Sequence, residues 1–120
     1  MTSRRAWTTN ELLICLAYYV TLGRSQRRSP PAWVLKELSE LINRTTGSIS
    51  LRFANFTAVD PQFTNAGLKG MDGGGAHVQN IWNECSKNDG ELDPVKIIRA
   101  IAKSLSLTSE KVVAEKIAGD

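Results

Sequence analysis

Apolar side chains recur at helical spacing in three successive segments of the amino-terminal half. Residues 12–20 follow a capping Thr8 or Thr9 and are apolar around almost their whole circumference, so this helix is expected to run through the centre of the domain. In the second segment, Pro31 suits the first helical position and a single stripe follows, made of Val34, Leu35, Leu38, Leu41 and Ile42. A third helix from about Ser48 to Ala58 repeats Ile49, Phe53 and Phe56.

Two different connections are expected between these helices. Residues 24–31 are polar and basic, with no apolar anchor apart from two prolines, and this pattern predicts a loop. Residues 43–47 form a short turn with a capping threonine. Two helices joined by so short a turn have the sequence shape of a helix-turn-helix, and we place such a unit at residues 31–58.

The carboxy-terminal half begins with a glycine-rich loop at residues 62–75, and helical spacing resumes after it. The C-terminal helices are expected within residues 76–118: one through Ile81 and Trp82, one capped by Asp93 with a stripe from Val95 to Leu105, and a short last one ending near Ile117. No segment alternates as a strand would. The predicted fold class is all-α: one domain, residues 1–120, a bundle of five to six helices containing a helix-turn-helix-like pair.

Charge divides the chain unevenly. Residues 1–56 hold eight Lys or Arg and three Glu, a net charge of +5, whereas residues 57–120 hold seven Lys or Arg and nine Asp or Glu, a net charge of −2. Seven of the eight basic residues in the first half are arginines, which make the better bidentate contacts to phosphate and guanine. The first half is therefore the place to expect a polyanion, although a scattered solvated surface gives the same composition.

Composition also excludes several classes of function. Two cysteines and one histidine are too few for a zinc site. The sequence shows no nucleophile paired with a base, no catalytic carboxylate pair and no P-loop motif for nucleotide phosphates. We therefore expect no enzyme, metal, cofactor or small-molecule substrate. The apolar stretch at residues 12–20 is too short to span a membrane. Arg4 and Arg5 imitate a secretory signal, but polar residues interrupt it and no cleavage site follows Leu22. A cytoplasmic protein, nucleoid-associated if it binds DNA, is expected.

Duplex DNA is the partner that the helix-turn-helix reading favours. The second helix of such a pair lies in the major groove, and at 100° per residue three hydrogen-bonding side chains are expected to face outward from it: Ser48, Arg52 and Asn55. The turn and the helix start, with Arg44 and Thr46, suit a phosphate. Further phosphate contacts are expected from the basic loop and from the glycine-rich loop, through Arg24, Arg27, Arg28 and Lys69.

A protein-binding module is the alternative interpretation. Two helices at a sharp turn are also a common way to pack a small helical domain, and Leu51 points away from the Ile49 face and needs a cover. In this reading, Leu51 and the C-terminal helices form the contact with another protein.

A set of spaced residues extends these readings to a family. The set comprises Trp7, Glu11-Leu12, Leu16 to Tyr19, Glu37-Leu38-Ser39, Leu41, Arg44 to Ile49, Asn55-Phe56, Asp60-Pro61, Gly67-Leu68, Gly70, Val78 and Trp82. In this order and spacing, residues 7–86 resemble the N-terminal module that precedes the nuclease domain in many bacterial HNH endonucleases of the restriction type. The resemblance implies a module that reads or positions DNA, modified DNA included, in restriction-modification and host defence.

The HNH metal and base residues are absent, so the resemblance does not carry cleavage to this chain. Two origins fit it: a module excised from a longer protein, or a stand-alone relative, such as a phage-borne protein that binds and inhibits a host defence nuclease.

Overall fold

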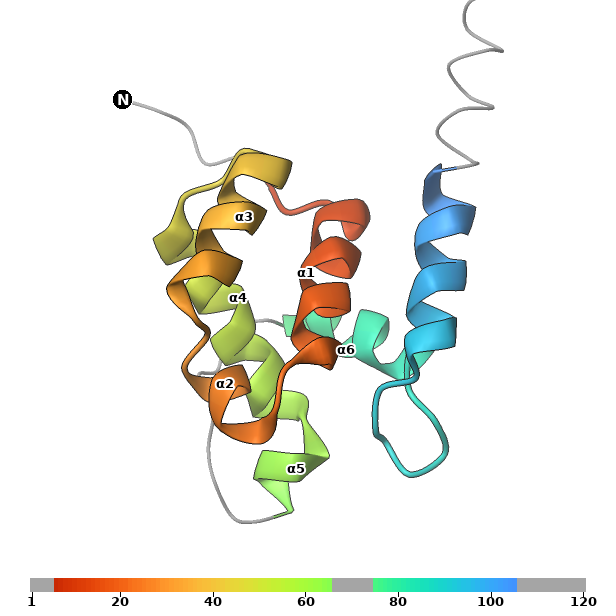
Figure 1. The fold of residues 1–120 in the computed structure, drawn as a ribbon. Helices are drawn as coiled ribbons and strands as arrows, with labels where there is room; N and C mark the ends of the chain where they lie inside the picture. Colours follow the sequence, from red (N-terminus) through yellow and green to blue (C-terminus); the bar gives the residue numbers. More distant parts are fainter. Residues whose placement is uncertain (1–5, 66–74, 106–120) are drawn as a thin grey trace, which may run out of the picture.

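The protein is all-α, as predicted. The computed structural model describes residues 6–65 and 75–105, and within these ranges the one pairing of extended backbone is an isolated bridge between Ser86 and Leu92. The labelled helices in Figure 1 are α1 (Thr9–Thr21), α2 (Arg24–Arg28), α3 (Ala32–Ile42), α4 (Thr46–Val59), α5 (Pro61–Thr64) and α6 (Gly75–Glu84). A further helix, drawn in blue and unlabelled, spans residues 94–105.

The start of α1 confirms the capping pattern seen in the sequence. Thr8 is the N-cap, its hydroxyl accepts from the Glu11 amide at 3.2 Å, and the Glu11 carboxylate accepts from the Thr8 amide at 3.0 Å. Such a capping box satisfies two amides that no helical carbonyl reaches. It also fixes the Glu11 carboxylate beside the first turn.

The predicted helix-turn-helix-like pair is α3 and α4. Asn43 ends α3 with a left-handed backbone, φ 55°, a conformation that asparagine adopts more readily than most residues. Thr45 then caps α4, accepting from the Ser48 amide at 3.1 Å. Three residues therefore reverse the chain between the two helices.

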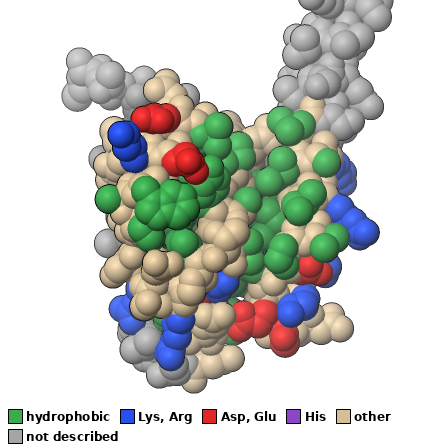
Figure 2. Space-filling model, in the orientation of Figure 1, with side chains coloured by type: hydrophobic (Ala, Val, Ile, Leu, Met, Phe, Trp, Pro, Cys, Tyr) green, Lys and Arg blue, Asp and Glu red, His purple; other side chains and the backbone are tan. Residues whose placement is uncertain are grey.

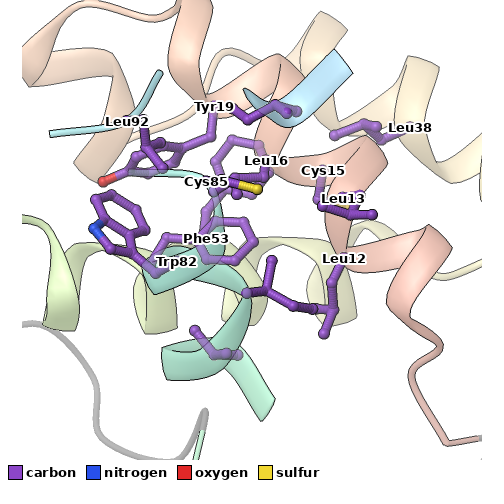
Figure 3. Close-up of a cluster of buried hydrophobic side chains, with 14 of the residues drawn as sticks. Leu12, Leu13, Cys15, Leu16, Tyr19, Leu38, Phe53, Trp82, Cys85 and Leu92 are labelled. Atoms are coloured by element: carbon purple, nitrogen blue, oxygen red, sulfur yellow. The ribbon is translucent and has the colours of Figure 1, made fainter. Parts of the chain in front are cut away.

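The helix α4 shares the centre of the domain with α1. It packs against α1, α2, α3, α5 and α6, and its Phe53 and Phe56 are both 1% exposed. Tyr19 of α1 meets these two rings and Trp82 of α6 edge-on, at centroid distances of 5.6, 5.3 and 5.8 Å. Figure 3 shows part of this core, with Tyr19 and Trp82 near Phe53. The sequence expectation for α1 agrees with the structure, because none of residues 12–20 is exposed and α1 packs against α3, α4 and α6.

Residues 24–28 are a helix, not the expected basic loop. Gly23 is the N-cap of α2. The side chain of Arg27 donates two hydrogen bonds to the end of α1, from Nε to the Leu22 carbonyl at 3.0 Å and from Nη2 to the Val20 carbonyl at 3.3 Å. These bonds anchor α2 to the end of α1. The sequence predicted a loop because the segment has no apolar residue to anchor a helix. The structure shows that the buried side chain of Arg27 is the anchor instead.

The glycine-rich region is also shorter than predicted. Residues 61–64 form α5, with Asp60 as its N-cap and Pro61 at its first position. Residues 66–74, which include Lys69, lie outside the described part of the chain, as does the last expected helix near residue 117.

Candidate binding surfaces

The Arg27 side chain, a predicted phosphate contact, lies inside the protein. Its Nη1 is 3.0 Å from the carboxylate of Asp60, and the two side chains are 8% and 0% exposed. The Tyr19 hydroxyl donates to the same carboxylate oxygen, while the Arg27 guanidinium lies 4.8 Å from the centroid of the Tyr19 ring. Burial and the neighbouring Asp60 raise the pKa of Tyr19 above its usual value, so the hydroxyl keeps its proton. Arg27 is committed to joining α1, α2 and the end of α4.

Arg44, in the turn before α4, is likewise committed to an internal contact. Its Nε and Nη2 donate to the two oxygens of Glu11 at 2.7 and 3.0 Å, and Nη2 donates to the Ala6 carbonyl at 2.7 Å. The guanidinium lies 4.3 Å above the ring of Trp7. The hydrogen bond from Arg44 is the main reason that the pKa of Glu11 falls to about 2. This bidentate ion pair ties the start of α1 to the start of α4.

The three side chains expected to face outward from α4 do not share an exposed surface. Asn55 is 3% exposed, so the expectation is wrong for this residue, and Ser48 and Arg52 are half-buried. The Arg52 guanidinium lies 5.3 Å from the Trp7 ring centroid, and its Nε is buried without a hydrogen-bond partner among the described residues. Burial, with Arg44 nearby, lowers the pKa of Arg52 from its usual value. Thr46, in the first turn of α4, is exposed.

The arginines are also divided between the two ends of α4. Arg44 precedes the N-cap Thr45, whereas Arg27 pairs with Asp60, the C-cap. A rise of about 1.5 Å per residue places these ends roughly 20 Å apart. Arg24 and Arg28 are exposed and lie with Arg27 on α2, at 5.8 and 5.7 Å from the ring centroid of Phe63. The arginines in the described part of the chain therefore do not gather into a single cluster of guanidinium groups.

The outward side of α4 carries almost no hydrogen-bonding groups. Its exposed and half-exposed positions on this side are Gly47, Ser50, Leu51, Ala54 and Ala58, with Leu51 at 44% exposure. Base edges are read mainly by charged, amide and hydroxyl side chains, and Ser50 is the one such residue among these five positions. The body of α4 therefore offers little for reading a base sequence.

A large apolar surface lies elsewhere, on helix 94–105. Val95, Ile98 and Leu105 are 52, 66 and 53% exposed, although the sequence pattern placed them in a core-facing stripe. Of the predicted stripe, Ile101 alone is half-buried against the core, and the side chain that this helix buries is Ile97, 1% exposed, which the pattern had not assigned to the stripe. The pattern identified the helix correctly, but it could not show how much of the stripe the rest of the domain would cover.

A second exposed apolar stripe, interrupted by the exposed Glu37, lies on α3. Trp33 and Leu41 are 60 and 59% exposed, and only Leu41 had been assigned, wrongly, to the core stripe. Figure 2 shows hydrophobic side chains gathered over α3 and α1 and again over helix 94–105, on the same side of the molecule. We call the five exposed residues on these two helices the apolar face: Trp33, Leu41, Val95, Ile98 and Leu105.

The described residues form neither a metal site nor a membrane-spanning helix. No group of three or more His, Cys, Asp or Glu side chains there could hold a metal ion. Within the same ranges, no helix has both the length and the apolar character needed to cross a membrane.

Comparisons of the chain with protein-family models, with curated proteins and with solved structures gave no match. The resemblance to the N-terminal module of HNH endonucleases therefore stays a prediction, and the function must be argued from the surfaces described above.

Replacing Arg27 tests whether this side chain is structural. Arg27→Ala leaves the buried Asp60 carboxylate without its cation, and we expect a loss of about 3–5 kcal/mol in the free energy of unfolding, measured by urea denaturation. Arg28→Ala, one residue along the same helix and exposed, is the matched control and should change it by less than about 0.5 kcal/mol. Equal effects of the two substitutions would show that the ion pair does not anchor α2.

The Glu11–Arg44 pair predicts a dependence of stability on pH. The pKa of Glu11 is about 2 in the folded protein against an ordinary 4.5, so the stabilisation is present above pH 4.5 and is lost as the pH falls toward 2. Glu11→Gln should cost about 1–3 kcal/mol of unfolding free energy at pH 7, and less than half of that at pH 3. Urea midpoints of both proteins at the two pH values measure this, and a difference that does not depend on pH would contradict it.

Proposed function

We propose that this domain is a non-catalytic protein-binding module and that the apolar face is its contact surface. The observation that carries the proposal is the orientation of helix 94–105. This helix turns Val95, Ile98 and Leu105 to solvent, each more than half exposed, and its charged residues Lys96, Arg99 and Lys103 are exposed along one edge of this stripe. An amphipathic helix normally buries its apolar stripe, so this one is built to meet another surface.

Scattered apolar side chains on a protein surface need no explanation, but a gathered set does. The apolar face combines two stripes on one side of the molecule and includes a tryptophan that is 60% exposed. Tryptophan is among the residues that contribute most to binding energy at protein interfaces. Soluble monomers rarely keep such a surface uncovered unless a partner uses it.

The geometry favours this function over base reading by α4. Two of the predicted DNA contacts, Arg27 and Asn55, are buried, and Arg44 is held by Glu11. The side of α4 that remains outward is made of small or apolar residues. A nuclease or another defence protein, the partner that the resemblance to HNH endonuclease modules implies, fits a domain that works by protein contact.

The test is to place a charge in the apolar face. Ile98→Asp should change the free energy of unfolding by no more than an ordinary surface substitution does, about 0.5 kcal/mol. It should weaken partner binding at least tenfold. Binding is measured by stoichiometric co-purification from an extract of the source cell, followed by titration of the purified partner. Asn80→Asp, the same charge change on the exposed side of α6, is the control and should bind like the unchanged protein.

Recovery of the same partner, at the same ratio, with the Ile98→Asp protein would remove the apolar face from consideration as the binding surface.

Nucleic acid is the second candidate partner, and one observation favours it. Arg24 and Arg28 project from α2 as exposed neighbours over Phe63, and no ion pair to either side chain occurs among the described residues. Two adjacent guanidinium groups suit a phosphate backbone without reading its bases. In this function α2 replaces α4 as the contacting element, with Arg52, Thr46 and Ser48 at the far end of α4 as further phosphate contacts.

Duplex binding measured at several salt concentrations tests this second candidate. If both arginines contact phosphates, the double substitution Arg24→Ala/Arg28→Ala should reduce the slope of log affinity against log salt by about 2 and weaken binding at low salt. Lys87→Ala, an exposed cation elsewhere, should change neither quantity. This candidate is excluded if the unchanged protein does not bind duplex DNA, or if its affinity for duplex DNA does not depend on the salt concentration.

A further inference from the structure

We infer that the apolar face binds a second copy of this chain, and that α3 of one copy packs against helix 94–105 of the other. The inference rests on the proposed protein-binding function and names the partner for the same surface. Its support comes from how the two apolar stripes and their charges are distributed over one side of the molecule.

The two stripes stand apart on the same face. In the view of Figure 1, α3, α1 and helix 94–105 stand in a row with α1 between the other two. The most exposed apolar residues belong to the outer two helices, Trp33 on α3 and Ile98 on helix 94–105, at 60 and 66% exposure. In the same orientation, Figure 2 shows hydrophobic surface on both outer helices. One flat surface laid across this face would meet both stripes at once.

The charges beside the two stripes have opposite signs. On α3, the charged side chains are Lys36, Glu37 and Glu40, a net charge of −1, and all three are exposed. On helix 94–105 they are Lys96, Arg99 and Lys103, a net charge of +3, and all three are exposed as well. Complementary potentials of this kind favour one orientation of two surfaces over others.

Symmetry turns this difference in sign into a specific arrangement. A two-fold axis that lies in the contact plane and runs along the helices places α3 of each copy over helix 94–105 of the other, so acidic meets basic and apolar meets apolar. A two-fold axis across the helices would set each helix against its own copy, with Arg99 and Lys103 facing the same cations. Only the first arrangement is self-complementary, and in it every favourable contact occurs twice.

A partner of different sequence would need a matching pair of apolar stripes with the charges reversed. The second copy already carries such a pair, since its α3 and helix 94–105 are the complement of helix 94–105 and α3 in the first. Trp33 of one copy, near the start of α3, then covers the neighbourhood of Ile98 in the other, which is the most exposed large apolar side chain on that helix. The exposed apolar face and the opposed charges thus have one explanation.

The mass of the full chain in solution tests the inference, by sedimentation equilibrium across roughly a hundredfold range of concentration. We expect a reversible monomer–dimer equilibrium. Glu40→Lys and Arg99→Glu should each raise the dimer dissociation constant, on the order of tenfold, because each places like charges at two symmetric points. The double substitution Glu40→Lys/Arg99→Glu should recover most of that loss, since it restores opposite signs across the interface.

Charge reversals outside the face serve as the matched control. Glu84→Arg and Lys87→Glu, both at exposed positions after or within α6, should leave the dimer dissociation constant unchanged. Circular dichroism on every variant establishes that it is folded. The dilution series of the unchanged protein tests dimer formation by itself, even if a variant fails to fold.

A wild-type chain that stays monomeric at the highest concentration would overturn the inference, as would a dimer that neither reversal weakens. The proposed function fails separately. A monomeric chain that still binds a different protein through Ile98 would keep the protein-binding function and lose the second copy as its partner, whereas a dimer unaffected by Ile98→Asp would count against both.

Discussion

The enclosure of α4 by the other helices is the constraint on which the rest of the structure depends. Phe53 and Phe56 of α4 meet Tyr19 of α1 edge-on, and the same tyrosine meets Trp82 of α6. At the two ends of α4, the buried Arg27–Asp60 pair and the Glu11–Arg44 pair hold α2 and the start of α1 in place. A helix held on so many sides is a core element. Its outward side carries small residues and Leu51, and not an array of base-reading side chains.

Much of the fold could be predicted from the sequence because its signals are local. The capping box at Thr8 and Glu11, the stripe on α3, the turn through Asn43 and the proline at the start of helix 94–105 each depend on residues within one or two turns. The helix α2 was missed because its anchor is not local. Arg27 is held by Asp60, which lies 33 residues away in the sequence.

The candidate site was harder to predict, for the same reason. Helical spacing correctly shows that Ile49, Phe53 and Phe56 share a face, but it does not show which other faces α5, α6 and α2 will cover. Asn55 is therefore buried, against expectation. The opposite error occurs on helix 94–105, where a stripe that looks like core is left open at Ile98. An amphipathic pattern identifies an apolar surface, and only the tertiary structure shows whether the same chain covers it.

These findings give the two helical surfaces different roles, with α4 holding the domain together and the apolar face meeting a partner. Oxidative footprinting of the chain in its free and assembled states tests this division most directly, because it reports the exposure of individual side chains. The account predicts that oxidation of Trp33 and Leu105 falls severalfold on assembly, whether the partner is a second copy or another protein, while Leu51 on α4 reacts at an unchanged rate. Protection of Leu51 with Trp33 and Leu105 still reactive would contradict it.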